Sequence, residues 1–161
     1  MIEYLCLFVA IMALDATDTA IINALRKDSR LSQRQLSQIV GVSQGTITNR
    51  IKKLESDGVI TGYTLTLNAD LVGWEMTVMA GLCIEKGRII EVQEKISSDP
   101  RVFAVYDVTG DWDSMVLARV RDRDDLDKLT KTVFTLDGIT RSYTHVVLNT
   151  VKESGIVLPE E

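Results

Sequence analysis

The chain has 161 residues, of which 45% are hydrophobic and 25% charged, a composition typical of folded soluble proteins with one large domain or two small ones. A net charge of −5 and an isoelectric point near 5.0 argue at first against a nucleic-acid partner. Cys6, Cys83 and the single His145 are too few for a four-ligand zinc site, so we expect no metal.

Residues 1–13 form an apolar N-terminal extension. The apolar run from Tyr4 to Ala13 is too short to cross a bilayer, and it lacks the basic start of a signal peptide. We expect a short helix or strand packed on the protein or on a partner subunit, in a cytoplasmic protein that makes no membrane contact. Alternatively, Met12 is the biological start and the preceding residues are an upstream extension.

Three short helices are predicted next. The first covers about residues 16–27, with Asp15 as its cap. The second follows the capping box that begins at Ser32, and it stops at Gly41. The third is capped by Ser43 and ends at Gly58. Two helices joined by so short a turn form a helix-turn-helix.

The third helix has a polar face opposite its apolar residue Ile47. At 100° per residue, Gly45, Asn49 and Lys52 lie on that face, which is small at its N-terminal end and basic at its C-terminal end. This distribution suits a recognition helix in the major groove, although a solvated face of an interaction domain is the alternative. The predicted DNA contacts are Ser43, Gln44, Gly45, Thr46, Thr48, Asn49, Arg50, Lys52 and Lys53.

Residues 59–67 have the composition of β-structure with a bend at Gly62, which predicts a wing after the third helix. From residue 74 the apolar residues alternate with a period of two, which predicts a strand with one buried face. A helix from Ile89, strands at about 102–109 and 113–121, a helix bearing Leu126 to Leu136, and a strand at about 139–151 follow.

The predicted fold class is therefore α+β, with an N-terminal winged helix-turn-helix followed by a ferredoxin-like βαββαβ domain. The expected divisions are an extension at 1–13, a DNA-binding domain at 14–63, a linker strand at 64–73, a sensor domain at 74–151 and a tail at 152–161. One sheet face is expected to carry both helices, which leaves the other face for a partner.

The segment from Leu14 to Pro159 resembles the Lrp/AsnC (feast/famine) family of prokaryotic transcription regulators. The resemblance rests on short motifs in matching order: Leu14-Asp15-x-x-Asp18, Thr46-Ile47-x-x-Arg50-Ile51-x-x-Leu54-Glu55, Gly58-Val59-Ile60, and Val105-Tyr106-x-x-Thr109-Gly110-Asp111-Trp112-Asp113. It implies a winged helix that binds DNA and a C-terminal domain that senses a free amino acid.

The resemblance also implies an effector site between dimers. Its residues would be Thr109, Gly110, Asp111, Trp112, Asp113, Ser142 and Thr144. The chemistry is reasonable, because Gly110 allows loop N–H groups to converge on a carboxylate and an Asp accepts from an α-ammonium. A plain hairpin turn is the alternative for this loop. We expect His145 to be structural.

The resulting hypothesis is a sequence-specific regulator of transcription that binds double-stranded DNA. A homodimer would assemble into a higher oligomer such as an octamer. An amino-acid effector, with no other cofactor, would change either that assembly or the binding to DNA. One alternative is a siroheme-decarboxylase-like enzyme, since such enzymes look similar to this family. Another is a sensor that acts only in mixed assemblies with relatives.

The net charge divides unevenly along the chain. Residues 1–63 contain seven Lys or Arg and six Asp or Glu, a net of +1, whereas residues 64–161 contain eleven and seventeen, a net of −6. The acidity therefore belongs to the predicted sensor half. The predicted DNA-binding half is weakly basic. This favours a modest affinity of each DNA-binding domain for DNA, and multivalent binding through an oligomer.

Overall fold

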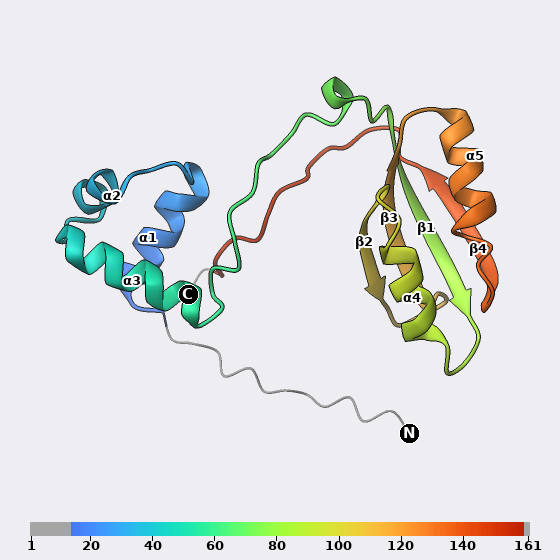
Figure 1. Ribbon diagram of the computed structural model, residues 1–161, viewed down its shortest axis with the longest axis horizontal. Helices are drawn as coiled ribbons and strands as arrows, with labels where there is room; N and C mark the ends of the chain where they lie inside the picture. The colour runs from blue at the N-terminus through green and yellow to red at the C-terminus, as the bar shows by residue number, and fades with distance from the viewer. Residues whose placement is uncertain (1–13, 160–161) are drawn as a thin grey trace. The chain divides into compact units, whose positions relative to one another are not determined.

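The computed structural model describes residues 14–159 and divides them into two compact units (Figure 1). The first unit contains residues 14–65 together with 155–159, and the second contains residues 66–154. The structure expected for residues 1–13 lies outside the described residues. Among residues 14–159, no helix is both long enough and apolar enough to span a membrane.

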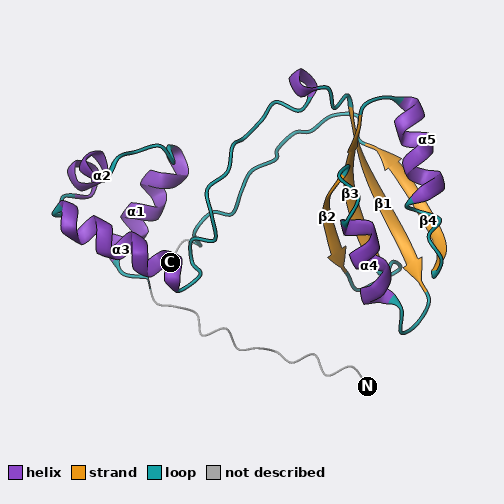
Figure 2. Ribbon diagram, in the orientation of Figure 1, coloured by secondary structure: helices purple, strands orange, loops and turns teal. Residues whose placement is uncertain are grey.

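The first unit contains three helices, drawn in purple in Figure 2: α1 (Ala16–Lys27), α2 (Gln33–Val40) and α3 (Gln44–Ser56). Each begins with the cap that the sequence predicts. The side chains of Asp15, Ser32 and Ser43 accept hydrogen bonds from the backbone N–H groups three residues later, which would otherwise be unpaired. The predicted helices and their starting points are confirmed.

The turn between α2 and α3 is made by Gly41. Its φ of 79° is in the left-handed region, where glycine has no side chain to clash with the backbone. This turn brings the apolar faces of the helices together around Ile21, Leu36, Ile47 and Leu54, all of which are at most 1% exposed. Each such side chain contributes about 1.5–3 kcal/mol of burial free energy.

The structure differs from the prediction at residues 59–67, where the sequence predicts the β-structure of a wing. No strand is formed there, because neither this segment nor any other described part of the first unit provides a hydrogen-bonded partner. Instead, the N–H groups of Val59 and Ile60 both donate to the Leu54 carbonyl, which ends α3. The predicted linker strand at 64–73 is likewise wrong, and the segment contains a short 3₁₀ helix, η1 (Asp70–Val72).

The C-terminal tail belongs to the first unit. Leu158 is partly buried against the same apolar core as α1, α2 and α3. Beside it lies a hollow of about 390 Å³, lined by residues of α1, by 59–64 and by 156–158. Residues 152–161 are predicted to be a separate tail, whereas the structure groups residues 155–159 with the helices.

The second unit is a four-stranded antiparallel sheet with the strand order β2-β3-β1-β4. In chain order its elements are β1 (Met76–Ile84), α4 (Ile89–Ser97), β2 (Val102–Asp107), β3 (Ser114–Val120), α5 (Arg123–Thr132) and β4 (Ile139–Val146). This confirms the predicted βαββαβ plan. The helix α5 ends at Thr132 and β4 ends at Val146, so both are shorter than the sequence pattern predicts.

Both helices pack on one face of this sheet. Val78, Ala80 and Leu82 of β1 are fully buried beneath them, in the same core as Val92 of α4 and Leu129 of α5. The predicted alternation along β1 is therefore confirmed.

The opposite face of the sheet carries no helix. Because directly opposed residues of antiparallel strands share a face, the registers assign the side chains of this helix-free face. They are Thr77, Met79, Gly81 and Cys83 of β1, Met115, Leu117 and Arg119 of β3, Ala104 and Tyr106 of β2, and Arg141, Tyr143 and His145 of β4.

Candidate functional site

The outward face of α3 has the orientation that its sequence predicts. Gly45, Asn49, Lys52 and Lys53 are exposed, whereas Ile47 is fully buried on the opposite side. The face is small and polar near the N-terminus of the helix and basic near its C-terminus. A helix with this surface can place its first turns near base edges and its cations near phosphates.

The first turn of α3 is held by its own hydroxyl groups. The Ser43 Oγ accepts from the Thr46 N–H at 3.1 Å and lies 2.9 Å from the Thr46 Oγ1. The Thr48 Oγ1 donates to the Gln33 Oε1 at 2.6 Å and contacts the Gln44 carbonyl at 2.9 Å. Gln33, at the start of α2, therefore lies beside the predicted interface. Gln33 could not be predicted from the sequence, because no periodicity or motif marks its contact with Thr48.

Arg50 lies on α3 but faces α1. Its Nη1 lies 2.5 Å from the Asp15 carboxylate and 3.2 Å from that of Asp18. These carboxylates raise the pKa of Arg50, and the Asp18 N–H together with Arg50 lowers the pKa of Asp15 against a smaller opposing effect of burial. Arg50 therefore links two helices, and its predicted contact with DNA stays a prediction.

The loop from Thr109 to Asp113 joins β2 to β3. Thr109, Gly110 and Asp111 are exposed, and Gly110 has a φ of 115°. Within the described part of the chain, the N–H groups of residues 109–112 donate no hydrogen bond. Backbone N–H groups without a partner can bind a carboxylate, and an exposed carboxylate can accept from an ammonium group, so a loop of this kind can hold a small molecule that has both groups.

Asp113 differs from its loop neighbours because its side chain already has a partner. One carboxylate oxygen accepts from the Ile84 N–H at 2.7 Å, and the Asp113 N–H donates to the Leu82 carbonyl at 2.9 Å. Both bonds tie the loop to β1. Asp113 thus has a structural contact that its place in the motif does not reveal.

The remaining predicted effector residues lie on two different faces of the sheet. Ser142 and Thr144 are opposite Leu82 and Ala80, so their side chains share the face that carries the helices. The Trp112 ring lies on the helix-free face instead, beside Arg141 and Tyr143. A single copy therefore does not gather all seven predicted residues around one point.

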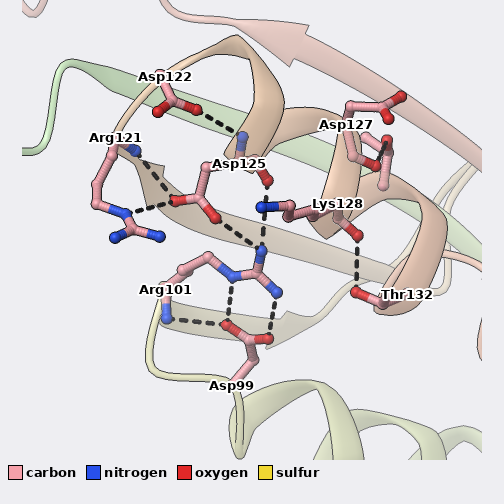
Figure 3. Close-up of polar contacts among 9 residues, drawn as sticks. Asp99, Arg101, Arg121, Asp122, Asp125, Asp127, Lys128 and Thr132 are labelled. Atoms are coloured by element: carbon pink, nitrogen blue, oxygen red, sulfur yellow. Dashed lines mark hydrogen bonds and ion pairs between the residues drawn. The ribbon is translucent and has the colours of Figure 1, made fainter.

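A cluster of charged side chains lies where α4, β2 and α5 meet (Figure 3). Arg101 forms ion pairs with Asp99 at 2.6 Å and with Asp125 at 3.1 Å, and the Asp125 carboxylate also accepts from the Arg121 N–H at 3.1 Å. A hollow of about 560 Å³ that includes Trp74 adjoins them. This cluster could not be predicted from the sequence, because its members are separated along the chain.

The cluster shifts the pKa values of its acids downward. Burial raises the pKa of Asp125, but the hydrogen bonds from Arg121 and Arg101 together outweigh it, so the net shift is downward. The Arg101 guanidinium is the main cause of the lowered pKa of Asp99. Each of the two acids has a cationic partner. Through Arg101, the cluster links α5 to the segment that follows α4.

Comparison with protein families matches both halves of the chain. A family model described as winged helix-turn-helix DNA-binding matches residues 14–61, and one described as the Lrp/AsnC ligand binding domain matches residues 77–157. The chain is similar to an uncharacterized HTH-type transcriptional regulator of Pyrococcus abyssi, with 45% identity over 87% of this chain and 95% of the relative. It is also 32% identical to the HTH-type transcriptional regulator FL11 of Pyrococcus furiosus, over 88% of this chain and 93% of FL11.

Solved structures share the fold. AsnC of E. coli superposes with a TM-score of 0.84 at 24% identity, covering 90% of this chain and 99% of AsnC. A transcriptional regulator of Neisseria meningitidis, solved as a complex with L-Met, has a TM-score of 0.82 at 23% identity and covers 88% of this chain and 94% of its own.

Proposed function

We propose an effector and an assembly for this chain, which belongs to the Lrp/AsnC family of DNA-binding transcriptional regulators. The effector is a free amino acid, and it binds at the loop 109–113. The observation that carries this proposal is that the N–H groups of residues 109–112 donate no hydrogen bond within the described residues, next to the exposed Asp111. Such groups bind the α-carboxylate, and Asp111 accepts from the α-ammonium.

The site is completed between copies of the chain. Ser142 and Thr144 lie on the other face of the sheet from Trp112, and in this proposal they contribute hydroxyl groups to the effector site of a neighbouring copy. The L-Met bound to the Neisseria regulator is an amino acid of the proposed class. A ligand held between copies changes their assembly if its affinity differs between assembly states.

Self-association is supported by exposed apolar side chains. Tyr106 and Tyr143 are each 53% exposed on the helix-free face. Phe103, which is 43% exposed, contacts Arg119 of that face. In the linker, Leu65 and Leu71 are 82% and 85% exposed. A second copy that covers these surfaces would remove apolar area from water, and a dimer also supplies the two recognition helices that operator specificity requires. We propose a homodimer that assembles further, for example to an octamer, in the cytoplasm.

In this proposal α3 reads the operator, with Asn49 near base edges and Lys52 and Lys53 near phosphates. The similar proteins named above are transcriptional regulators, which favours regulation over the siroheme-decarboxylase alternative.

A thermal-shift screen of the twenty amino acids tests the effector. A ligand that binds only the folded protein stabilises it by about 2.7 kcal/mol at a hundredfold excess over Kd, so at least one amino acid should raise Tm by several degrees. Asp111→Ala should remove this shift. Asp124→Ala, at an exposed carboxylate on α5, is the matched control and should keep it. If no amino acid raises Tm, the proposed effector is wrong.

A further inference from the structure

The indole ring of Trp112 lies directly on the backbone of Gly81, in the middle of β1. A Cβ atom added to Gly81 would lie 2.6 Å from Cδ2, 2.7 Å from Cε2 and 2.9 Å from Cγ of this ring. No other side chain fits here, because any Cβ would occupy the space of the indole. Gly81 is buried although it faces the helix-free side of the sheet.

Two side chains of β4 continue this contact across the helix-free face. The Arg141 guanidinium carbon lies 4.8 Å from the centroid of the Trp112 ring, within the range of a cation–π interaction. The ring centroids of Trp112 and Tyr143 are 6.3 Å apart, and those of Tyr143 and His145 are 4.7 Å apart. Trp112 therefore begins a row of side chains in contact, with tilted rings, that runs along β4.

The residues on either side of Trp112 are bonded to β1. The Cys83 Sγ lies 3.6 Å from the Asp111 carbonyl oxygen, and the Asp113 N–H donates to the Leu82 carbonyl at 2.9 Å. Residues 109–111 are one to three peptide units from Trp112, so a movement of this segment reaches the indole through the backbone. The same side chain is thus part of the loop and part of the helix-free face.

We propose that Trp112 is the residue that transmits the state of the loop 109–113 to the surface on which a second copy docks. This inference rests on the function proposed above. When an amino acid binds the loop N–H groups, the backbone at Trp112 shifts and the ring changes its position over Gly81. Arg141 and Tyr143 follow, so the shape of the docking surface changes. Trp112 is a positioning residue in this scheme, because its ring acts on the docking surface.

Gly81→Ala tests the contact between Trp112 and the docking surface without substituting a residue of the loop. In a Trp74→Phe background, Trp112 is the only tryptophan of the chain. The added methyl group should displace the indole, so that its emission moves to longer wavelength and acrylamide quenches it more strongly. Sedimentation of the full chain without amino acid should show the dimer dissociation constant raised about tenfold, as for loss of an aromatic anchor. Gly45→Ala, at a helical glycine distant in sequence, is the control and should leave emission and association unchanged.

A double-mutant cycle separates this role from general damage to β1. If Gly81 acts through Trp112, then Gly81→Ala should have no further effect on association once Trp112→Ala is present. Additive effects, or unchanged association in Gly81→Ala with a displaced indole, would overturn the proposal. A wild-type chain that sediments only as a monomer would overturn it too. Circular dichroism melts establish that each variant is folded.

Measurements with an added amino acid distinguish failure of this proposal from failure of the proposed function. With an amino acid that stabilises the wild type, Gly81→Ala should still gain Tm, because Gly81 is not part of the proposed effector site, but it should lose the ligand-dependent change in sedimentation. If that change persists in Gly81→Ala while the indole is displaced, Trp112 does not transmit it. If no amino acid stabilises the wild type, the effector is wrong, while the ligand-free association of Gly81→Ala still decides whether Trp112 shapes the docking surface.

Discussion

The guanidinium of Arg50 on α3 donates to the carboxylate of Asp18 on α1, with Nη1 3.2 Å from Oδ2. Asp18 is only 5% exposed, and its carboxylate also accepts from the Asp15 N–H as part of the capping box of α1. One arginine therefore joins the predicted recognition helix to the cap of the first helix. The contact restricts how α3 can be oriented in the domain.

Arg50→Gln should destabilise the first unit, because it leaves the nearly buried Asp18 without its cation. We expect Tm to fall by several degrees before any DNA is added, measured by circular dichroism. Lys52→Gln, at an exposed lysine of the same helix, is the control and should change Tm little. Equal Tm values for both variants would contradict the structural role of Arg50.

Asn49→Ala and Lys53→Ala should affect DNA binding in different ways. Loss of a base contact costs about 1–3 kcal/mol of discrimination, so Asn49→Ala should bring specific and nonspecific sequences closer together. Loss of a phosphate contact should weaken binding to all sequences and reduce the slope of log K against log salt by about 1. Fluorescence anisotropy with a promoter fragment and a scrambled duplex, at several salt concentrations, separates the two. If neither variant alters binding, the assignment of this face to DNA is wrong.

Two glycines of the helix-turn-helix should respond oppositely to alanine. At Gly41, φ is 79°, so Gly41→Ala should destabilise the protein by about 1–2 kcal/mol. Gly45 is helical and a Cβ there would meet only the Ser43 Oγ at 3.8 Å, so Gly45→Ala should stabilise the free protein by about 0.5–1 kcal/mol.

If the backbone at Gly45 approaches DNA closely, the same variant should bind DNA more weakly in spite of its higher stability. Urea denaturation and anisotropy measured on the same preparations decide this. A Gly45→Ala variant that binds with unchanged affinity would contradict the close approach.

The helices could be predicted almost residue by residue because their signals are local. Asp15, Ser32 and Ser43 lie within three residues of the N–H groups that they cap, and Gly41 stops α2 through its own backbone conformation. The alternation that places Val78 and Ala80 in the core is equally local. The helices and strands of both units could therefore be predicted from patterns within single elements.

The features that could not be predicted from the sequence depend on which helices and strands lie next to one another. Alternation separates Ser142 and Thr144 from Tyr143, but only the pairing of β4 with β1 shows which set shares a face with Trp112. The wing at 59–67 was predicted from strand-like composition, and composition does not provide a pairing partner. Gly81 carries no motif, because its requirement comes from a ring that lies 31 positions later in the chain.

The stability of the second unit should depend on pH through Asp99 and Asp125. Their pKa values are lowered in the folded state, so their stabilising contribution is complete above the unfolded value of about 3.9 and is lost as the pH falls through the folded values. The wild type should therefore lose stability as the pH is lowered below about 4. Urea denaturation between about pH 7 and pH 2 measures this loss.

Asp125→Asn should cost about 3 kcal/mol at pH 7, because it leaves Arg101 short of a carboxylate in a nearly buried cluster, and it should flatten the acid dependence. Asp127→Asn is the matched control, since Asp127 forms an exposed pair with Lys131 on the same helix. That variant should change stability by less than about 0.5 kcal/mol. Similar losses for the two variants would contradict the role assigned to the cluster.

The packing of Leu158 against the core of α1–α3 has a consequence for synthesis. The ribosome completes the three helices long before it adds Leu158, because the whole sheet domain lies between them in the sequence. When residues 14–65 have just emerged from the ribosome, the three helices are present. The chain still lacks Leu158, one of the side chains that cover their core. The helical unit therefore reaches its full packing only after the sheet of the second unit has been synthesised.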